Sequence, residues 1–440
     1  MSEASHSAVA LQRFVLKSGV RLMCAPLPTT HRVAVSVHVH SGARFESAEL
    51  GGISHFHEHM LHRGTSSHPS AHALALAFEE LGSELGAATY VDHTLLNAVT
   101  PLESLGQVLQ LFGELISAPV FTELELERGI VREEILESVN EAGQSVDADE
   151  LVMSLAFPEH PLGRPITGTL STLERFDIPA LQRFHEEHYH AGGIVVSVSG
   201  PIEPAAVLAL CEQAFANVPA GKRPALVTPE PLKGPVFAYT DDTGSQTALR
   251  LSFRAPSEAD PREAATELLL RVLDDGMSTR LYHQVCDERG LAYDVSATYE
   301  AFADTGLFTL AGESAHRSIE QLLSAFFGVI QALCDEGPTE AELIKAKRRQ
   351  RFQMQGLLDD PVELSAFVGL GELTGLARTP ELRVASLAQL TCDDVRRAAQ
   401  EVFQPAGLAV AVVGQLSKSK RKALEQMVRA FRQAAPAQLN

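Results

Sequence analysis

Alternating apolar and polar residues mark several strands along the 440-residue chain. The run AVSVHVHSG from Ala34 and the run ALRLSFRAP from Ala248 both alternate as half-buried strands do. Continuous apolar runs such as IVVSVSG, which ends at Gly200, are typical of central strands. Helical patterns between the strands cover residues 71–82, 101–117, 122–142, 261–275 and 339–356. This mixture predicts an α+β fold in which helices cover a sheet.

The chain also resembles itself at a fixed offset of 214 residues. Ala34 lies 214 residues before Ala248, at the start of the two alternating runs. The segment from Leu173 to Gly200 aligns without gaps with the segment from Leu387 to Gly414 at the same offset. Because one offset recurs near both ends of each half, we predict two homologous α/β-sandwich domains that arose by internal duplication.

Five prolines between residues 219 and 235 separate the two copies. Proline continues neither a helix nor a central strand, so this stretch is predicted to be a linker. We therefore expect an amino-terminal domain over residues 1–217, a proline-rich linker over 218–236 and a carboxy-terminal domain over 237–440.

Composition narrows the classes of function. Apolar residues make up 45% of the chain, as in folded globular proteins, and the net charge of −20 disfavours nucleic acid or an anionic membrane as a partner. The five cysteines form no C-x-x-C pair, which indicates a reducing compartment. No run reaches the roughly 18 apolar residues of a membrane span, and the amino terminus lacks the apolar core of a secretory signal. These features predict a cytoplasmic protein.

The segment GGISHFHEHMLHRGT, residues 51–65, contains an H-x-x-E-H pattern formed by His55, Glu58 and His59. On a helix, the two histidines are one turn apart, about 5–6 Å between Cβ atoms, which suits two imidazoles on one metal ion. Glu58 is rotated only about 60° from His55, so its carboxylate can reach a water on that ion. The pattern is typical of zinc peptidases, in which zinc lowers the pKa of water to about 7.

A third ligand is needed, and a helix that merely carries surface histidines is the alternative interpretation. The acidic segment over residues 122–142 offers several glutamates, most of which are expected to be solvated. Glu127 and Glu134 share a helical face but lie about 10.5 Å apart along the axis, so both cannot bind one ion. Spacing alone does not choose between them.

These motifs resemble those of the pitrilysin/insulinase metallopeptidases (inverzincins), specifically the half-length branch related to mitochondrial processing peptidase. The resemblance covers nearly the whole chain. It includes M-L-H-R-G-T after H-x-x-E-H, LGSELGAATYVDHT from Leu81, E-R-G-I-V-R-E-E, P-L-G-R-P-I-T-G-T, D-D-G-M-S-T-R-L-Y and E-R-G-L-A-Y. It implies one Zn²⁺ per chain, bound by His55, His59 and Glu134, with Glu58 as the general base.

The resemblance assigns further roles in the first half. Glu127 is expected to be a supporting carboxylate near the site, whereas His57 and His62 have no expected catalytic role. The family binds its peptide substrate as an added strand, and the matching edge strand here is the stretch from Gly86 to Thr94. Many relatives have Asn in place of Gly86. The expected substrate-binding residues are Gly86, Ala87, Ala88 and Thr89.

The second half has no counterpart of the zinc motif and is expected to be a scaffold. Relatives often carry an Arg and a Tyr seven residues apart that stabilise the developing oxyanion. The tyrosine matches Tyr293, but the arginine position holds Cys286. A buried free cysteine is commoner than a reactive one, so Cys286 is not predicted to be a nucleophile.

Chains of this length in the family form half of a clamshell, and two of them enclose a chamber. Because Cys286 replaces the arginine, the resemblance favours a dimer with a related subunit over a homodimer. The predicted function is the catalytic subunit of a zinc-dependent endopeptidase that hydrolyses unfolded peptides. The alternatives are a non-catalytic peptide-binding or scaffold subunit of a processing-peptidase-like complex, and a metal-dependent hydrolase of non-peptide substrates.

Overall fold

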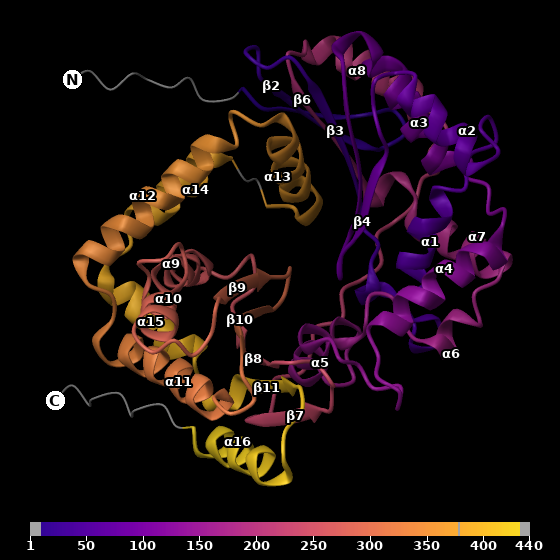
Figure 1. Cartoon of the computed structure of the whole chain (residues 1–440). Helices are drawn as coiled ribbons and strands as arrows, with labels where there is room; N and C mark the ends of the chain where they lie inside the picture. Colours follow the sequence, from indigo (N-terminus) through magenta and orange to yellow (C-terminus); the bar gives the residue numbers. More distant parts are fainter. Residues whose placement is uncertain (1–9, 377–378, 432–440) are drawn as a thin grey trace, which may run out of the picture. The chain divides into compact units, whose positions relative to one another are not determined.

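The computed structural model describes residues 10–376 and 379–431 (Figure 1). The first nine residues of the expected amino-terminal domain and the last nine of the expected carboxy-terminal domain lie outside the described residues. The chain forms two compact units, and neither is one continuous stretch of sequence. Among the described residues, the first unit comprises 10–135, 165–226, 353–376 and 379–383, and the second comprises 136–164, 227–352 and 384–431.

The first unit is built on a six-stranded mixed sheet with the strand order β1-β2-β6-β3-β5-β4. Strands β2 and β6 are parallel, and the other neighbours are antiparallel. Strand β4 is therefore at an edge of this sheet. The strands are β1 (Gln12–Val15), β2 (Arg21–Pro26), β3 (Val33–Val39), β4 (Gly86–Thr89), β5 (Thr94–Thr100) and β6 (Ile194–Gly200).

The second unit repeats this topology in a five-stranded sheet with the order β7-β11-β8-β10-β9. Strands β3 and β8 begin at Val33 and Thr247, and β6 and β11 begin at Ile194 and Leu408, so both pairs differ by 214 residues. The predicted fold of two homologous α/β domains is confirmed. The strands are β7 (Val236–Thr240), β8 (Thr247–Ala255), β9 (Val295–Ala301), β10 (Gly306–Ser314) and β11 (Leu408–Val413).

Helices lie on both faces of the first sheet (Figure 1). Alternation along β3 sends Val33, Val35 and Val37 into the main hydrophobic core, which α3 and α8 help to enclose. The opposite face of β3 and β6 is covered by α13. The helices that contribute to this unit are α1 (Ile53–Leu61), α2 (Ala71–Glu79), α3 (Leu105–Ser117), α4 (Leu124–Glu137), α6 (Leu170–Leu173), α7 (Ile178–His188), α8 (Pro204–Ala214) and α13 (Pro361–Thr374).

Helix α13 belongs to the first unit although it lies in the second half of the sequence. The hydroxyl groups of Ser36 and Ser365 form a buried hydrogen bond of 2.7 Å between β3 and α13. A Cβ atom at Gly369 would lie 2.5 Å from the His38 ring, so the helix approaches the sheet closely. Glu372 accepts hydrogen bonds from Arg13 at 2.9 Å and Arg21 at 3.1 Å. These contacts complete the first unit.

Helix α5 (Ala148–Ala156) makes the reciprocal exchange, since it comes from the first half but packs on β8 and β11. Arg250 on β8 donates from Nε and Nη2 to the carboxylate of Asp149 at 2.7 and 2.9 Å. The compact units thus differ from the continuous ranges expected for the two domains. The remaining helices are α9 (Glu263–Leu273), α10 (Arg280–Tyr282), α11 (Ile319–Glu336), α12 (Glu340–Gly356), α14 (Pro380–Ala388), α15 (Cys392–Val402) and α16 (Lys418–Ala430).

Most predicted helices agree with the structure to within a few residues. The patterns over 71–82, 122–142 and 339–356 correspond to α2, α4 and α12. Residues 218–235 of the expected linker 218–236 contain no helix or strand, and Val236 begins β7. Among the described residues, no helix has both the length and the apolar character needed to cross a membrane.

Candidate metal centre

Helix α1 carries the H-x-x-E-H residues, and hydrogen bonds to a carboxylate fix its amino-terminal end. The backbone N–H groups of Gly52 and Ser54 both donate to the carboxylate of Glu46 at 2.7 Å. An acidic group is favourable there because the first N–H groups of a helix lack helical partners. Gly52 has a positive φ of 91°, and a Cβ at this position would lie 2.6 Å from the Thr167 carbonyl oxygen. Only glycine fits this start.

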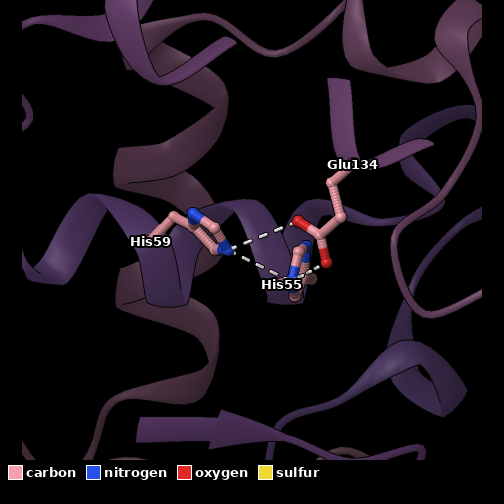
Figure 2. A group of neighbouring side chains, drawn as sticks. All are labelled: His55, His59 and Glu134. Atoms are coloured by element: carbon pink, nitrogen blue, oxygen red, sulfur yellow. Dashed lines mark hydrogen bonds and ion pairs between the residues drawn. The ribbon is translucent and has the colours of Figure 1, made fainter. Parts of the chain in front are cut away.

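The side chains of His55, His59 and Glu134 converge, two from α1 and one from α4 (Figure 2). The two Nε2 atoms are 3.2 Å apart. Glu134 places Oε1 3.5 Å from Nε2 of His55 and Oε2 3.8 Å from Nε2 of His59. The structure therefore brings together the three residues that the resemblance implied as ligands.

This donor set fits a zinc ion. Two nitrogens bound at about 2.05 Å to one tetrahedral ion lie about 3.3 Å apart, close to the separation of the two imidazoles. One ligand atom from each of the three residues lies within 4.8 Å of the other two. Two imidazoles with one carboxylate are typical of catalytic zinc sites, which keep a fourth position for water or substrate.

Burial prepares His55 for this role. Its side chain is buried, and desolvation, assisted by the charge of His59, lowers the pKa of His55 to about 4. The imidazole is therefore neutral at pH 7 and keeps a lone pair for a metal ion.

His59 is oriented by a carboxylate behind it. Its Nδ1 lies 2.8 Å from Oε1 of Glu127, so Nδ1–H donates and Nε2 is left to face His55 and Glu134. Glu127 also accepts hydrogen bonds from Arg63. Burial favours the neutral form of Glu127, but the hydrogen bonds from His59 and Arg63 outweigh it and lower the pKa of this carboxyl. Glu127 thus contacts a candidate ligand, as the expected supporting carboxylate would.

Glu58 lies on the same helix and is also buried. Its Oε2 accepts a hydrogen bond of 3.2 Å from the Thr89 hydroxyl, and its Oε1 is 3.8 Å from Nε2 of His62. Desolvation raises the pKa of Glu58 above its ordinary value, which makes the carboxylate a better proton acceptor. The contact of His62 with Glu58 was missed by sequence reasoning, although their i,i+4 spacing is a signal for it.

The edge strand β4 lies beside α1 and is shorter than the expected stretch from 86 to 94. It ends at Thr89, and β5 begins at Thr94. Gly86 is paired with Asn97 of β5, and a Cβ at Gly86 would lie 2.4 Å from Oδ1 of Asn97. The carboxamide of Asn97 therefore occupies the space above Gly86, a placement that the sequence pattern did not reveal.

His57, for which no catalytic role is expected, packs inside the first unit and hydrogen-bonds to His185. Nε2 of His185 donates to the Ile116 carbonyl at 3.0 Å, so its Nδ1 must accept, and His57 Nε2–H donates to it at 3.1 Å. The His57 ring is fully buried against Phe184 and Tyr189. Desolvation holds the pKa of His57 well below its ordinary value, so the ring is neutral.

The residues expected to act from the second half lie in the second unit. Tyr293 is 92% exposed and, with Arg250 and Asp294, borders a small pocket at the start of β9. Cys286 is half-buried, and desolvation, followed by the charges of Asp294 and Asp287, raises the pKa of its thiol. A raised pKa argues against an activated thiolate. The role of Tyr293 stays a prediction.

Comparisons with known proteins place the chain among zinc proteases of one peptidase family. The family model described as insulinase (peptidase family M16) matches residues 21–170, and the model described as peptidase M16 inactive domain matches residues 175–350. An uncharacterized zinc protease of Mycobacterium bovis is 29% identical over 97% of this chain and 97% of its own length. The uncharacterized zinc protease YmxG of Bacillus subtilis is 28% identical over 89% of this chain and 96% of its own length.

Solved structures show the same fold. A structure from Pseudomonas fluorescens, described as a peptidase M16 inactive domain, superposes with a TM-score of 0.85 at 21% identity and covers 93% of this chain and 99% of its own. A protease from Helicobacter pylori superposes with a TM-score of 0.84 at 20% identity and covers 92% of this chain and 99% of its own.

Proposed function

The chain belongs to the insulinase (M16) family of peptidases as a half-length member, and on that premise we propose that it is a zinc-dependent endopeptidase. One observation carries the proposal. His55, His59 and Glu134 converge, and the buried carboxylate of Glu58 lies on the same helix as the two histidines. The names of the relatives as zinc proteases support the same chemistry.

The residues of the metal centre have separate roles in the proposed hydrolysis of a peptide bond. A zinc ion, when bound, supplies Lewis acidity that lowers the pKa of a water molecule and polarises a carbonyl group. Glu58 takes the proton from the attacking water and delivers it to the leaving amine. The Thr89 hydroxyl holds Oε2 of Glu58 in place during both transfers. Burial keeps the carboxylate of Glu58 basic enough for this exchange.

The substrate proposed is an unfolded peptide. Strand β4 is at the edge of its sheet, so one row of its backbone N–H and C=O groups has no partner strand among the described residues. An extended peptide can pair with such an edge through main-chain hydrogen bonds, which demand little of its sequence. Thr89 ends this strand and contacts Glu58, which links the proposed peptide-binding edge to the proposed base.

We propose further that the chain is the catalytic subunit of a dimer with a related subunit. Cys286 supports this proposal, because its thiol does not supply the positive charge that an arginine would give to an oxyanion. The same residue favours the alternative, a peptide-binding or scaffold subunit without activity of its own. Addition of a related subunit from the same source would give cleavage that depends on Glu58 of this chain in the first case and no cleavage that depends on Glu58 in the second.

The first test is cleavage of a diverse quenched peptide pool by the full-length, zinc-loaded protein. Glu58→Gln should retain zinc, because Glu58 is not among the three converging ligands, and should lose at least about 100-fold in rate, as expected for loss of a general base. Glu125→Gln is the matched control, since Glu125 is an exposed glutamate on α4. Its rate should equal that of the wild type.

The outcomes separate the candidate functions. Cleavage that vanishes in Glu58→Gln supports a self-sufficient peptidase. Cleavage that persists in that variant contradicts the role of Glu58 as base. A wild-type protein that binds zinc and cleaves nothing, with or without a related subunit, contradicts the peptidase proposal and favours the scaffold subunit.

A further inference from the structure

Arg63 lies two residues after the end of α1 and four residues beyond His59. Its guanidinium is largely buried and contacts the carboxylate of Glu127 on α4 and that of Glu123, the residue just before α4. Nε and Nη2 both contact Oε2 of Glu127, and Nη1 donates to Oε2 of Glu123 at 3.1 Å. A guanidinium that uses all three of its nitrogens on the start of one helix fixes that helix end relative to the segment after α1.

The carboxylate of Glu127 is divided between two partners. One oxygen, Oε2, is occupied by Arg63, and the other, Oε1, accepts from Nδ1–H of His59 at 2.8 Å. The Glu127 side chain is only 5% exposed, so water cannot readily replace either partner. Rotation of this carboxylate would break both interactions together.

We propose that Arg63 is a positioning residue of the metal centre. By holding Oε2 of Glu127, Arg63 keeps Oε1 on Nδ1 of His59. That contact sets the tautomer and the ring orientation in which Nε2 of His59 faces His55 and Glu134. Arg63 therefore acts on a bound metal ion through two intermediates and touches neither metal nor substrate. The inference rests on the proposed function only in taking zinc as the ion.

The geometry requires an arginine rather than any cation. A planar guanidinium offers Nε and Nη2 side by side to one carboxylate oxygen, while Nη1 remains for Glu123. A lysine ammonium is a single point of charge on a flexible chain and cannot hold both carboxylates in one orientation. Lysine at this position should preserve the charge balance and lose most of the orientation of Glu127.

Zinc affinity of the full-length protein, measured by competition with a chromophoric chelator, tests the proposal. Arg63→Met should raise the dissociation constant for zinc by about 10–100-fold, the range typical of outer-shell partners of metal ligands. Arg63→Lys should give an intermediate value. Arg132→Met is the matched control. Arg132 lies on α4, as Glu127 does, but it pairs at the surface with Glu174. Its zinc affinity should equal that of the wild type.

A double-mutant cycle with Glu127→Gln distinguishes positioning from a general loss of structure. The carboxamide that this substitution introduces can still accept from His59 but carries no charge for Arg63 to hold, and the double variant leaves no unpaired buried charge. If Arg63 acts through Glu127, Arg63→Met should change the zinc dissociation constant less than about twofold in the Glu127→Gln background. Fully additive losses would overturn the proposal.

Zinc binding needs no substrate, so this result is independent of peptidase activity. A wild type that binds zinc without cleaving peptides would contradict the proposed function and leave the cycle interpretable. At saturating zinc, Arg63→Met should recover most of the wild-type cleavage rate, which a damaged active site would not. Equal zinc affinity in the wild type and Arg63→Met overturns the positioning role, and a wild type without zinc affinity overturns both proposals.

Discussion

Two buried glutamates, Glu58 on α1 and Glu127 on α4, lie in opposite electrostatic environments. Desolvation raises the pKa of Glu58, whereas hydrogen bonds from His59 and Arg63 overcome desolvation and lower the pKa of Glu127. One carboxylate is thereby suited to exchange a proton and the other to remain charged. The H-x-x-E-H spacing was enough to nominate Glu58, but nothing in the spacing revealed Arg63, which makes Glu127 an anion that binds protein instead of metal.

The Thr89 hydroxyl provides a prediction at the scale of one residue. Thr89→Val keeps the shape of the side chain but removes the hydrogen bond to Oε2 of Glu58. Loss of a hydrogen bond to a charged group is worth about 1.5–3 kcal/mol, so the peptide cleavage rate should fall by about 10–100-fold. Zinc affinity should not change. Thr89→Ser restores a hydroxyl and should recover the rate; equal rates in Thr89→Val and the wild type would show that this contact does not orient the base.

Elements were easier to predict than their partners. Periodicity located α2, α4, α9 and α12, because an amphipathic face repeats every 3.6 residues whatever it packs against. The same argument explains why the exchange of α5 and α13 was not foreseen. A helical pattern shows that one face is buried but not which sheet buries it, and the two sheets share a topology. Tertiary contacts alone decide that α13 packs on β3 and β6.

The packing of α13 gives a prediction at this scale. In Gly369→Val, the new Cβ would lie 2.5 Å from the buried His38 ring and 3.0 Å from Cβ of Ser197. Overpacking of this kind costs about 1–3 kcal/mol, and the free energy of unfolding in urea should fall by that amount. His38→Ala in the same chain makes room and should return part of the loss. Additive destabilisation by the two substitutions would mean that His38 is not the obstacle.

Across the whole molecule, the duplication was readable from sequence because strands of similar pattern recur at one offset. The dependence of stability on acidic pH could not be predicted from the sequence, because it depends on which histidines are buried. Desolvation lowers the pKa of His38 to about 3, and burial likewise lowers the pKa values of His40, His185 and His188 to about 4. Four histidines of the first unit are therefore held neutral at pH 7.

These histidines should make the folded chain acid-sensitive. Below pH 6.5 the unfolded chain binds protons that the folded chain does not, so stability falls as the pH falls from 6.5 toward 4. Within this window, each histidine lowers the free energy of unfolding by up to about 1.4 kcal/mol for every pH unit of acidification. Above pH 6.5 it has no such effect. Urea unfolding at pH 7.5, 6.5, 5.5 and 5.0 should show a plateau followed by a steep fall. A flat profile down to pH 5.0 would contradict the depressed pKa values.

Because α13 packs on the first sheet but lies late in the sequence, the ribosome synthesises the sheet well before this helix. The last first-half segment of the first unit ends at residue 226, but the segment that contains α13 ends at residue 383. At a synthesis rate of roughly 5–20 residues per second, about 8–30 s pass between the synthesis of residue 226 and that of residue 383. During this time α13 does not yet cover the nascent sheet. The face that waits carries Ser36, His38 and Ser197, which are polar for buried strand positions. Their polarity suits a sheet face that is exposed to water until α13 has been synthesised and packs on it.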